Sequence, residues 1–259
     1  MILLAVLLSL LAGVGCRGAF SDDTTRARRR ATDSTLAAAQ AALEQGRPWH
    51  ASRLLAPLLA DTASRSPEVQ LAAARAAAGW RGWIEVRRIL EGATWVDTAF
   101  DGGGNELLAR AALALRDDST AMRQAQRARE AASGDAGAYR RVLLARAYDR
   151  VGANDSAAAE YLRAAEALPE IGDWLRLRAL AVTRDSAARA GLAAAISDPF
   201  VRGRLPLAEA RAWERAGDTA RAISAYTTAE PLGALRLRLA THDRKSTRLN
   251  SSHPYRSRM

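Results

Sequence analysis

One spacing of small, aromatic and glycine residues occurs twice in the chain and constrains its fold more than any other feature. Residues three or four positions apart lie on one face of a helix, so the spacing describes an amphipathic helix. A glycine then allows the chain to turn, and small residues in the next helix allow close approach around an aromatic side chain. In residues 141–169 the pattern occupies Leu144, Ala145, Tyr148, Gly152, Ala157, Tyr161, Ala164 and Pro169. In residues 207–229 it occupies Ala210, Trp213, Gly217, Ala222, Tyr226 and Ala229.

This spacing resembles the tetratricopeptide repeat, in which a helix-turn-helix pair forms one unit of a stack. Ala145 and Ala210 hold equivalent positions 65 residues apart, close to two repeat lengths, so a further pair is expected at residues 174–196. Weaker versions of the pattern occur at residues 36–59, 69–90 and 107–132. The resemblance implies an all-α fold, with about six helix-turn-helix pairs stacked into a right-handed α-solenoid over residues 33–242.

The composition agrees with helices. Hydrophobic residues make up 49% of the chain but aromatic residues only 5%, so alanine and leucine dominate the apolar set. These residues favour helices, whereas strands favour β-branched and aromatic residues. The polar clusters that begin at Asp117 and Asn154 are expected to cap the helices that follow. Residues 101–104, Asp-Gly-Gly-Gly, are expected to form a turn, because they lack the Lys-Ser/Thr ending of a phosphate-binding loop.

Residues 1–15 are typical of a signal peptide, because they form an apolar run that is too short to span a bilayer and ends in small residues. Cys16, the only cysteine, follows directly. The segment resembles a bacterial lipoprotein signal, in which that cysteine is lipidated and becomes the mature N-terminus. Gly13 departs from the resemblance, because such signals usually have an aliphatic residue at that position. An ordinary secretory signal with an incidental cysteine is the alternative.

We therefore expect an exported, periplasmic protein that a lipid on Cys16 attaches to the membrane. Residues 16–32 are expected to form a flexible basic linker. The net charge of +10 is concentrated in two places: residues 16–30 hold five arginines and two aspartates, and residues 243–259 hold five basic residues and one acidic residue. Between them the two signs are mixed, as on a solvated helix face, so nucleic acid is not an expected partner.

Residues 243–259 differ from the rest of the chain. They contain Lys245, the only lysine, in a sequence whose other long basic residues are all arginine. The stretch DRKSTRLNSSH can be encoded by a nucleotide string that resembles a widely used sequencing-library adapter. We expect this tail to be non-native and adapter-derived, with the native sequence interrupted near His242. A natural, disordered basic tail is the alternative.

The sequence suggests no catalytic residue, metal site or cofactor. His50 is the only histidine before residue 242 and has no cysteine or histidine nearby, so a capping or packing role is expected. Trp80, Trp83 and Trp95 are close in sequence. On a concave face they would stack on sugar rings or hold a partner peptide. Aromatic residues in helical repeats more often fill the space between helices, and this core role is the one we favour.

Residues 168–179, with Pro169 followed by Asp173 and Trp174, resemble the helical superhelix of soluble-type lytic transglycosylases. Those enzymes cleave peptidoglycan with a separate lysozyme-like domain. The family's catalytic glutamate stands in a Glu-Ser pair, and this chain contains no such pair. The first hypothesis is therefore the non-catalytic N-terminal part of such an enzyme, with peptidoglycan as its partner. The alternative is a non-enzymatic tetratricopeptide-repeat lipoprotein that binds proteins of the cell envelope.

Overall fold

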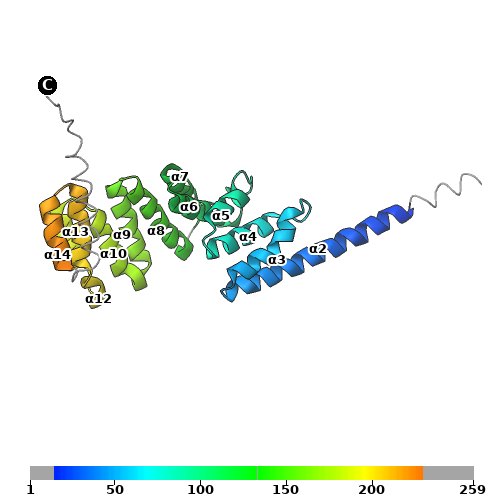
Figure 1. Ribbon diagram of the computed structural model, residues 1–259, viewed down its shortest axis with the longest axis horizontal. Coiled ribbons are helices and arrows are strands. Elements are labelled where there is room, and N and C mark those ends of the chain that lie inside the picture. The colour runs from blue at the N-terminus through cyan, green and yellow to red at the C-terminus, as the bar shows by residue number, and fades with distance from the viewer. Residues whose placement is uncertain (1–14, 133, 230–259) are drawn as a thin grey trace, which may run out of the picture. The chain divides into compact units, whose positions relative to one another are not determined.

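The computed structural model describes residues 15–132 and 134–229, with side chains from residue 23 onward (Figure 1). Within these residues every regular element is helical, so the expected all-α class is confirmed. The chain divides into two compact units between Ala131 and Ala132. The expected signal peptide before residue 15, the side chain of Cys16 and the expected tail at residues 243–259 lie outside the described part.

Within the described residues, the first unit consists of three helix pairs that stack in chain order (Figure 1). Each pair contacts the next, α3 against α4 and α5 against α6. The first helices of successive pairs also touch, α2 against α4 and α4 against α6. The elements are α2 (Gly15–Glu44), α3 (Pro48–Ala60), α4 (Pro67–Gly79), α5 (Trp83–Leu90), η1 (Phe100–Gly102), α6 (Gly103–Leu115) and α7 (Asp118–Glu130).

The second unit has the same plan, with a short helix before its last pair. Its pairs are α8 with α9, α10 with α11, and α13 with α14, and α10 contacts both α9 and α13. Arg215 of α13 forms an ion pair with Asp149 of α8 at 2.8 Å and donates to the carbonyl of Ala181 in α10. The elements are α8 (Gly134–Arg150), α9 (Asn154–Ala167), η2 (Pro169–Ile171), α10 (Gly172–Val182), α11 (Ser186–Ala194), α12 (Pro199–Arg202), α13 (Leu205–Ala216) and α14 (Thr219–Ala229).

Five of the helix pairs turn through the same junction. Just after the first helix of each pair, a single residue has a left-handed backbone. The backbone N–H of the residue that follows it donates to the carbonyl five residues earlier, at 2.8 to 3.0 Å. This is the Schellman ending, which satisfies carbonyls left free at a helix C-terminus. The left-handed residues are Gly46, Arg81, Arg116, Gly152 and Gly217. The first four follow one another at intervals of 35, 35 and 36 residues.

Burial follows the junctions at fixed offsets in both units. Seven residues before each junction the first helix buries an alanine, and five and nine residues after it the second helix buries its inner face. The alanines are Ala39, Ala74, Ala109, Ala145 and Ala210. The residues five positions after are Ala51, Val86, Ala121, Ala157 and Ala222, and those nine positions after are Leu55, Leu90, Ala125, Tyr161 and Tyr226. Small residues at these contacts let the helix axes approach closely.

The other residues of the expected packing pattern vary in burial. Leu144 and Ala164 are buried, whereas Tyr148 and Trp213 are half-buried against the same clusters. Ala229, the last described residue, is half-buried. These five residues are therefore buried or half-buried, whereas Pro169 is exposed and begins η2. The fixed φ of proline suits the first position of a helical turn.

Helix α2 includes residues that the sequence assigned to a linker. Residues 16–32 lie within α2, and the side chains of residues 23–31 are exposed. Arginine and alanine are strong helix formers, so residues 23–31 continue the helix without a buried face of their own. Thr32 is the first half-buried residue, and its hydroxyl lies 3.5 Å from that of Ser64. No helix in the described part is both long enough and apolar enough to cross a membrane.

The two predicted caps differ in outcome. Asp117 caps α7 as expected, because its carboxylate accepts the N–H of Thr120 at 3.1 Å. The prediction at Asn154 was wrong: Ala153 precedes α9 without a side-chain cap, and Asn154 is the first helical residue and is buried. Ala153, which follows Gly152, both completes the Schellman ending of α8 and stands at the N-cap position of α9. Asn154 therefore lies inside the helix and not at its cap.

Candidate functional site

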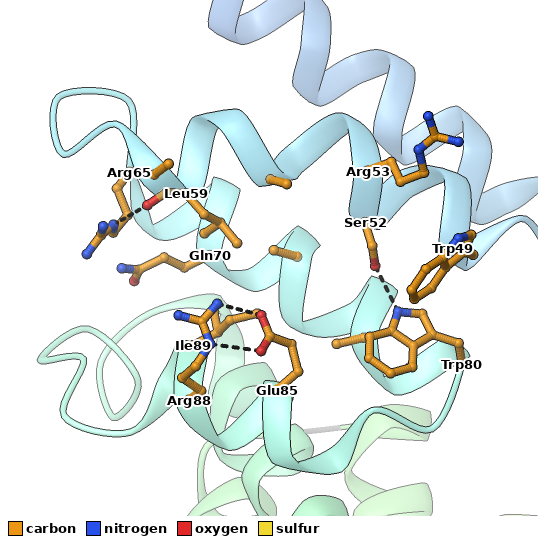
Figure 2. Close-up of a pocket in the computed structure, with 14 residues that line it drawn as sticks. Trp49, Ser52, Arg53, Leu59, Arg65, Gln70, Trp80, Glu85, Arg88 and Ile89 are labelled. Carbon is orange, nitrogen blue, oxygen red and sulfur yellow. Dashed lines mark hydrogen bonds and ion pairs between the residues drawn. The ribbon is translucent and has the colours of Figure 1, made fainter.

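A groove of about 520 Å³ lies in the first unit between α3 and α5, with one face of α4 as its floor (Figure 2). Gln70, Ala73, Ala77 and Trp80 come from α4 and the residue after it, and their spacing places them on one helix face. Ala73 and Ala77 are buried, and their methyl groups leave the space above α4 open. The same small alanine side chains that allow close helix packing therefore leave a groove on the surface between the two helix pairs.

Two tryptophans form one end of the groove. Trp49, at the start of α3, meets Trp80 edge to face with ring centroids 5.2 Å apart and an interplanar angle of 82°. The indole N–H of Trp80 donates to Ser52 Oγ at 2.9 Å, which fixes the ring across α3 and α4 (Figure 2). Gly82 leaves the space that this ring occupies, because a Cβ there would lie 2.1 Å from it. Trp49 is 61% exposed and Trp80 37%, so both present apolar surface to a ligand.

The guanidinium groups of Arg65 and Arg88 form the other end (Figure 2). Arg65 donates from Nε to the carbonyl of Leu59 at 2.7 Å, and its two Nη groups make no hydrogen bond or ion pair with the described residues. Arg88 pairs with both oxygens of Glu85, at 2.8 and 2.5 Å. That arginine lowers the pKa of the Glu85 carboxyl below its usual value. Arg53, beside Trp49, has no ion-pair partner among the described residues.

The structure separates the three tryptophans that the sequence grouped together. Trp80 lines the groove, whereas Trp83 and Trp95 are half-buried against the core of the first unit. Trp95 packs edge to face on Phe100 at 5.4 Å and donates to Gln70 Oε1 at 2.5 Å. For these two the favoured core role agrees with their positions. Sequence reasoning missed Trp49, because it belongs to a different pair and no periodicity links it to Trp80.

His50 and the glycine-rich residues 101–104 are solvent-facing or structural. His50 is exposed on α3, and the residue at the N-cap of that helix is Arg47, so the expected capping or packing role is not observed. Gly102 and Gly104, from the predicted glycine turn, are buried at the start of α6, Gly102 against Ala128 and Ala131 and Gly104 against Trp95 and Val96. In the described residues, no three His, Cys, Asp or Glu side chains lie close enough together to hold a metal ion.

Asp173 forms a second cluster, in the second unit at the start of α10. Its carboxylate accepts the backbone N–H of Ser197 at 2.9 Å and of Asp198 at 2.8 Å, and it pairs with Arg176 at 2.7 Å. The backbone N–H of Asp198 is the main reason why the pKa of Asp173 falls to about 2. This carboxylate therefore holds the loop before α12 against α10.

Trp174, the neighbour of Asp173, lies on the exposed side of this junction. Its ring and that of Phe200 are 6.0 Å apart, and the two are 40% and 66% exposed. The guanidinium of Arg204 lies 5.5 Å from the centre of the Phe200 ring. The start of α10 thus combines a structural carboxylate with a small aromatic surface.

No family model matches the chain, and no curated protein matches it. Among solved structures, the chain is similar to BtubC (BKLC) from P. vanneervenii. The sequence identity is 15% and the TM-score 0.44, over 88% of this chain and 96% of that one. At this identity and score the similarity assigns neither a family nor an activity.

Proposed function

We propose that this chain is a non-catalytic binding scaffold of the tetratricopeptide type, and that it belongs to an exported, lipid-anchored envelope protein. The observation that carries the proposal is the groove, where two exposed tryptophans and three arginines converge from two adjacent helix pairs. Exposed aromatic and arginine side chains are the residues that most often dominate protein interfaces. The repeated Schellman junctions support the tetratricopeptide-like arrangement.

The scaffold function is tested by capture and reconstitution. The full chain is immobilised, proteins retained from an envelope extract are identified, and each candidate is then purified and titrated against the chain. We expect at least one purified envelope protein to bind directly and saturably. A chain that retains no protein, while it sediments with purified peptidoglycan, would contradict the proposal.

The peptidoglycan alternative has its own supporting feature. Trp174 and Phe200 form an exposed aromatic pair in the segment that resembles lytic transglycosylases, and such rings stack on sugars. If the chain is the superhelical part of such an enzyme, it should sediment with purified peptidoglycan, and Trp174→Ala should weaken this at least about threefold. Trp49→Ala serves as the matched variant in the other unit and should leave sedimentation unchanged.

Neither reading gives the chain an activity of its own. We expect the purified chain to release no muropeptides from peptidoglycan, because no catalytic residue could be assigned to it. Chromatography of the soluble products after prolonged incubation, with lysozyme as a positive control, checks this expectation. Muropeptides above the level of a buffer blank would refute it.

The anchor is tested at Cys16. In a bacterial host, lipidation of this residue should place the protein in the membrane fraction and allow metabolic labelling with a fatty acid. Cys16→Ser should abolish the label and release the protein in soluble form. Equal labelling of the two proteins would rule out this residue as the lipid attachment site.

A further inference from the structure

We infer that the groove between α3 and α5 binds an acidic peptide segment of a partner protein, with an apolar side chain on Trp49 and Trp80 and carboxylates at Arg65 and Arg88. This inference rests on the proposed scaffold function and specifies the class of ligand. The two ends of the groove are chemically distinct, as Figure 2 shows: the indole rings lie at one end, and Arg65 and Arg88 lie at the other. A ligand that satisfies both ends must combine an apolar group with negative charge.

The hydrogen-bonding groups in the groove are mainly donors. Arg53 and the Nη groups of Arg65 have no partner among the described residues. The acceptors are already engaged: Gln70 Oε1 accepts from Trp95, and both oxygens of Glu85 accept from Arg88. Guanidinium groups recognise carboxylates through two parallel hydrogen bonds, so the free donors match acidic side chains.

Arg88 can exchange its partner when a ligand arrives. Its side chain is 66% exposed and that of Glu85 34%, and an exposed ion pair of this kind contributes little to stability. A ligand carboxylate can therefore share or replace Glu85 at small cost. The net charge of these two residues with Arg53 and Arg65 remains positive, which also attracts an acidic segment from a distance.

The rings of Trp49 and Trp80 are held in position before a ligand binds, and they offer a surface for an apolar side chain. Ser52 satisfies the indole N–H of Trp80, so this ring contributes its surface rather than a free donor. Trp49 packs edge to face with Trp80 and is the more exposed of the two. Because the rings are positioned before binding, little side-chain entropy is lost when a ligand aromatic ring or leucine packs on them.

Neutral sugars fit the groove less well than acidic peptides do. Sugar hydroxyl groups carry no charge, so they cannot form ion pairs with the guanidinium groups of Arg53 and Arg65. Single-stranded nucleic acid shares the negative charge and the preference for aromatic rings, but it binds grooves that follow its backbone over several nucleotides. This groove has its arginines confined to a space of about 520 Å³.

The test is fluorescence anisotropy with the full chain and labelled peptides that are blocked at both ends. The probe is Gly-Trp-Gly-Asp-Glu-Glu. The comparison peptides are Gly-Trp-Gly-Asn-Gln-Gln, which lacks the charge, and Gly-Gly-Gly-Asp-Glu-Glu, which lacks the aromatic ring. We expect the probe to bind about tenfold or more tightly than either comparison peptide, and its affinity to fall as salt is added.

Variants then locate the binding site. The double substitution R65Q/R88Q should reduce probe affinity about tenfold or more, whereas the charge-matched R178Q/R184Q on the exposed surface of the second unit should not. Trp49→Ala should weaken the probe but hardly affect the peptide without tryptophan. Trp174→Ala, which changes an exposed tryptophan in the other unit, should affect neither. Circular dichroism shows whether each variant is folded.

Other outcomes overturn the inference. Equal binding of the charged and uncharged peptides would show that the groove does not recognise acidic peptides. An unchanged affinity in a folded R65Q/R88Q chain would show that the probe binds elsewhere. Equal or tighter binding of single-stranded oligonucleotides or muropeptides at the same variants assigns the groove to those ligands instead. If a reconstituted envelope partner binds the R65Q/R88Q and Trp49→Ala chains normally, the scaffold function stands and only this inference fails.

Discussion

At the scale of single residues, two arginines occupy positions where glycine is the unstrained choice. Arg81 and Arg116 have φ values of 64° and 63°, in the left-handed region that residues with a Cβ rarely adopt. Gly46, Gly152 and Gly217 fill the same junction position elsewhere. The junction therefore requires a backbone conformation, and glycine is only the residue that adopts it most easily.

Replacing these arginines should stabilise the first unit. We expect Arg81→Gly and Arg116→Gly each to raise the free energy of unfolding by about 0.5–1 kcal/mol, because the relief of left-handed strain exceeds the added flexibility of the unfolded chain. Urea unfolding followed by circular dichroism measures the change. Gly217→Ala should shift the midpoint in the opposite direction. Lower stability in both arginine variants would show that their side chains make a compensating contribution.

Two glycines with the same backbone conformation provide a matched test of packing. Gly102 and Gly152 both have φ of 75°, but a Cβ on Gly102 would lie 2.9 Å from the Cβ of Ala131, whereas one on Gly152 would meet nothing within 4 Å. Gly152→Ala should cost about 1 kcal/mol from backbone strain alone. Gly102→Ala should cost about 1–3 kcal/mol more because of overpacking. Equal losses in urea unfolding would mean that the contact at Gly102 relaxes freely.

At the scale of elements, the sequence predicts a helix pair best where the junction holds glycine and the second helix holds an aromatic residue. The pairs around Gly152 and Gly217 are clear in the sequence, whereas the ones that turn at Arg81 and Arg116 are weak, since arginine gives no turn signal. The pair at Gly46 has the glycine but is also weak, because Leu55 stands where the clear pairs have a tyrosine. The groove could not be predicted, because Trp49 and Trp80 meet only through the stacking of two pairs. Spacing along one helix carries no information about that contact.

The junction between α10 and α12 should depend on pH through Asp173. Folding lowers the pKa of this carboxyl from 3.8 to about 2, so its ionised form stabilises the folded state above about pH 4. That contribution is lost as the pH falls towards 2. Asp173→Asn should lower the urea midpoint at pH 7 and flatten its change between pH 5 and pH 2. The exposed Asp135→Asn is the control, and an identical pH profile in the Asp173 variant would contradict the assignment.

At the scale of the whole molecule, stability is distributed among neighbouring pairs. Within each unit a pair contacts the pairs before and after it, and few contacts join distant parts of the sequence. In stacks of this kind a local change destabilises its neighbours most. The chain should therefore unfold in segments rather than in one cooperative step.

Hydrogen exchange measured by mass spectrometry can resolve these segments. In the Gly102→Ala chain we expect faster exchange in α6 and α7, with a smaller effect in α4 and α5, and no change in α13 and α14. Uniform acceleration across all described helices would indicate that the two units unfold together.

The nearly equal spacing of the junctions at Gly46, Arg81, Arg116 and Gly152 has a consequence for how such a gene can change in length. A deletion of one period, for example residues 82–116, joins the turn after α4 directly to α7 and keeps the face of every later helix in register. Unequal recombination would then yield shorter or longer chains that remain foldable. Expression of this deletion, with a deletion of half a period as comparison, should give a soluble protein with a helical circular dichroism spectrum only in the first case.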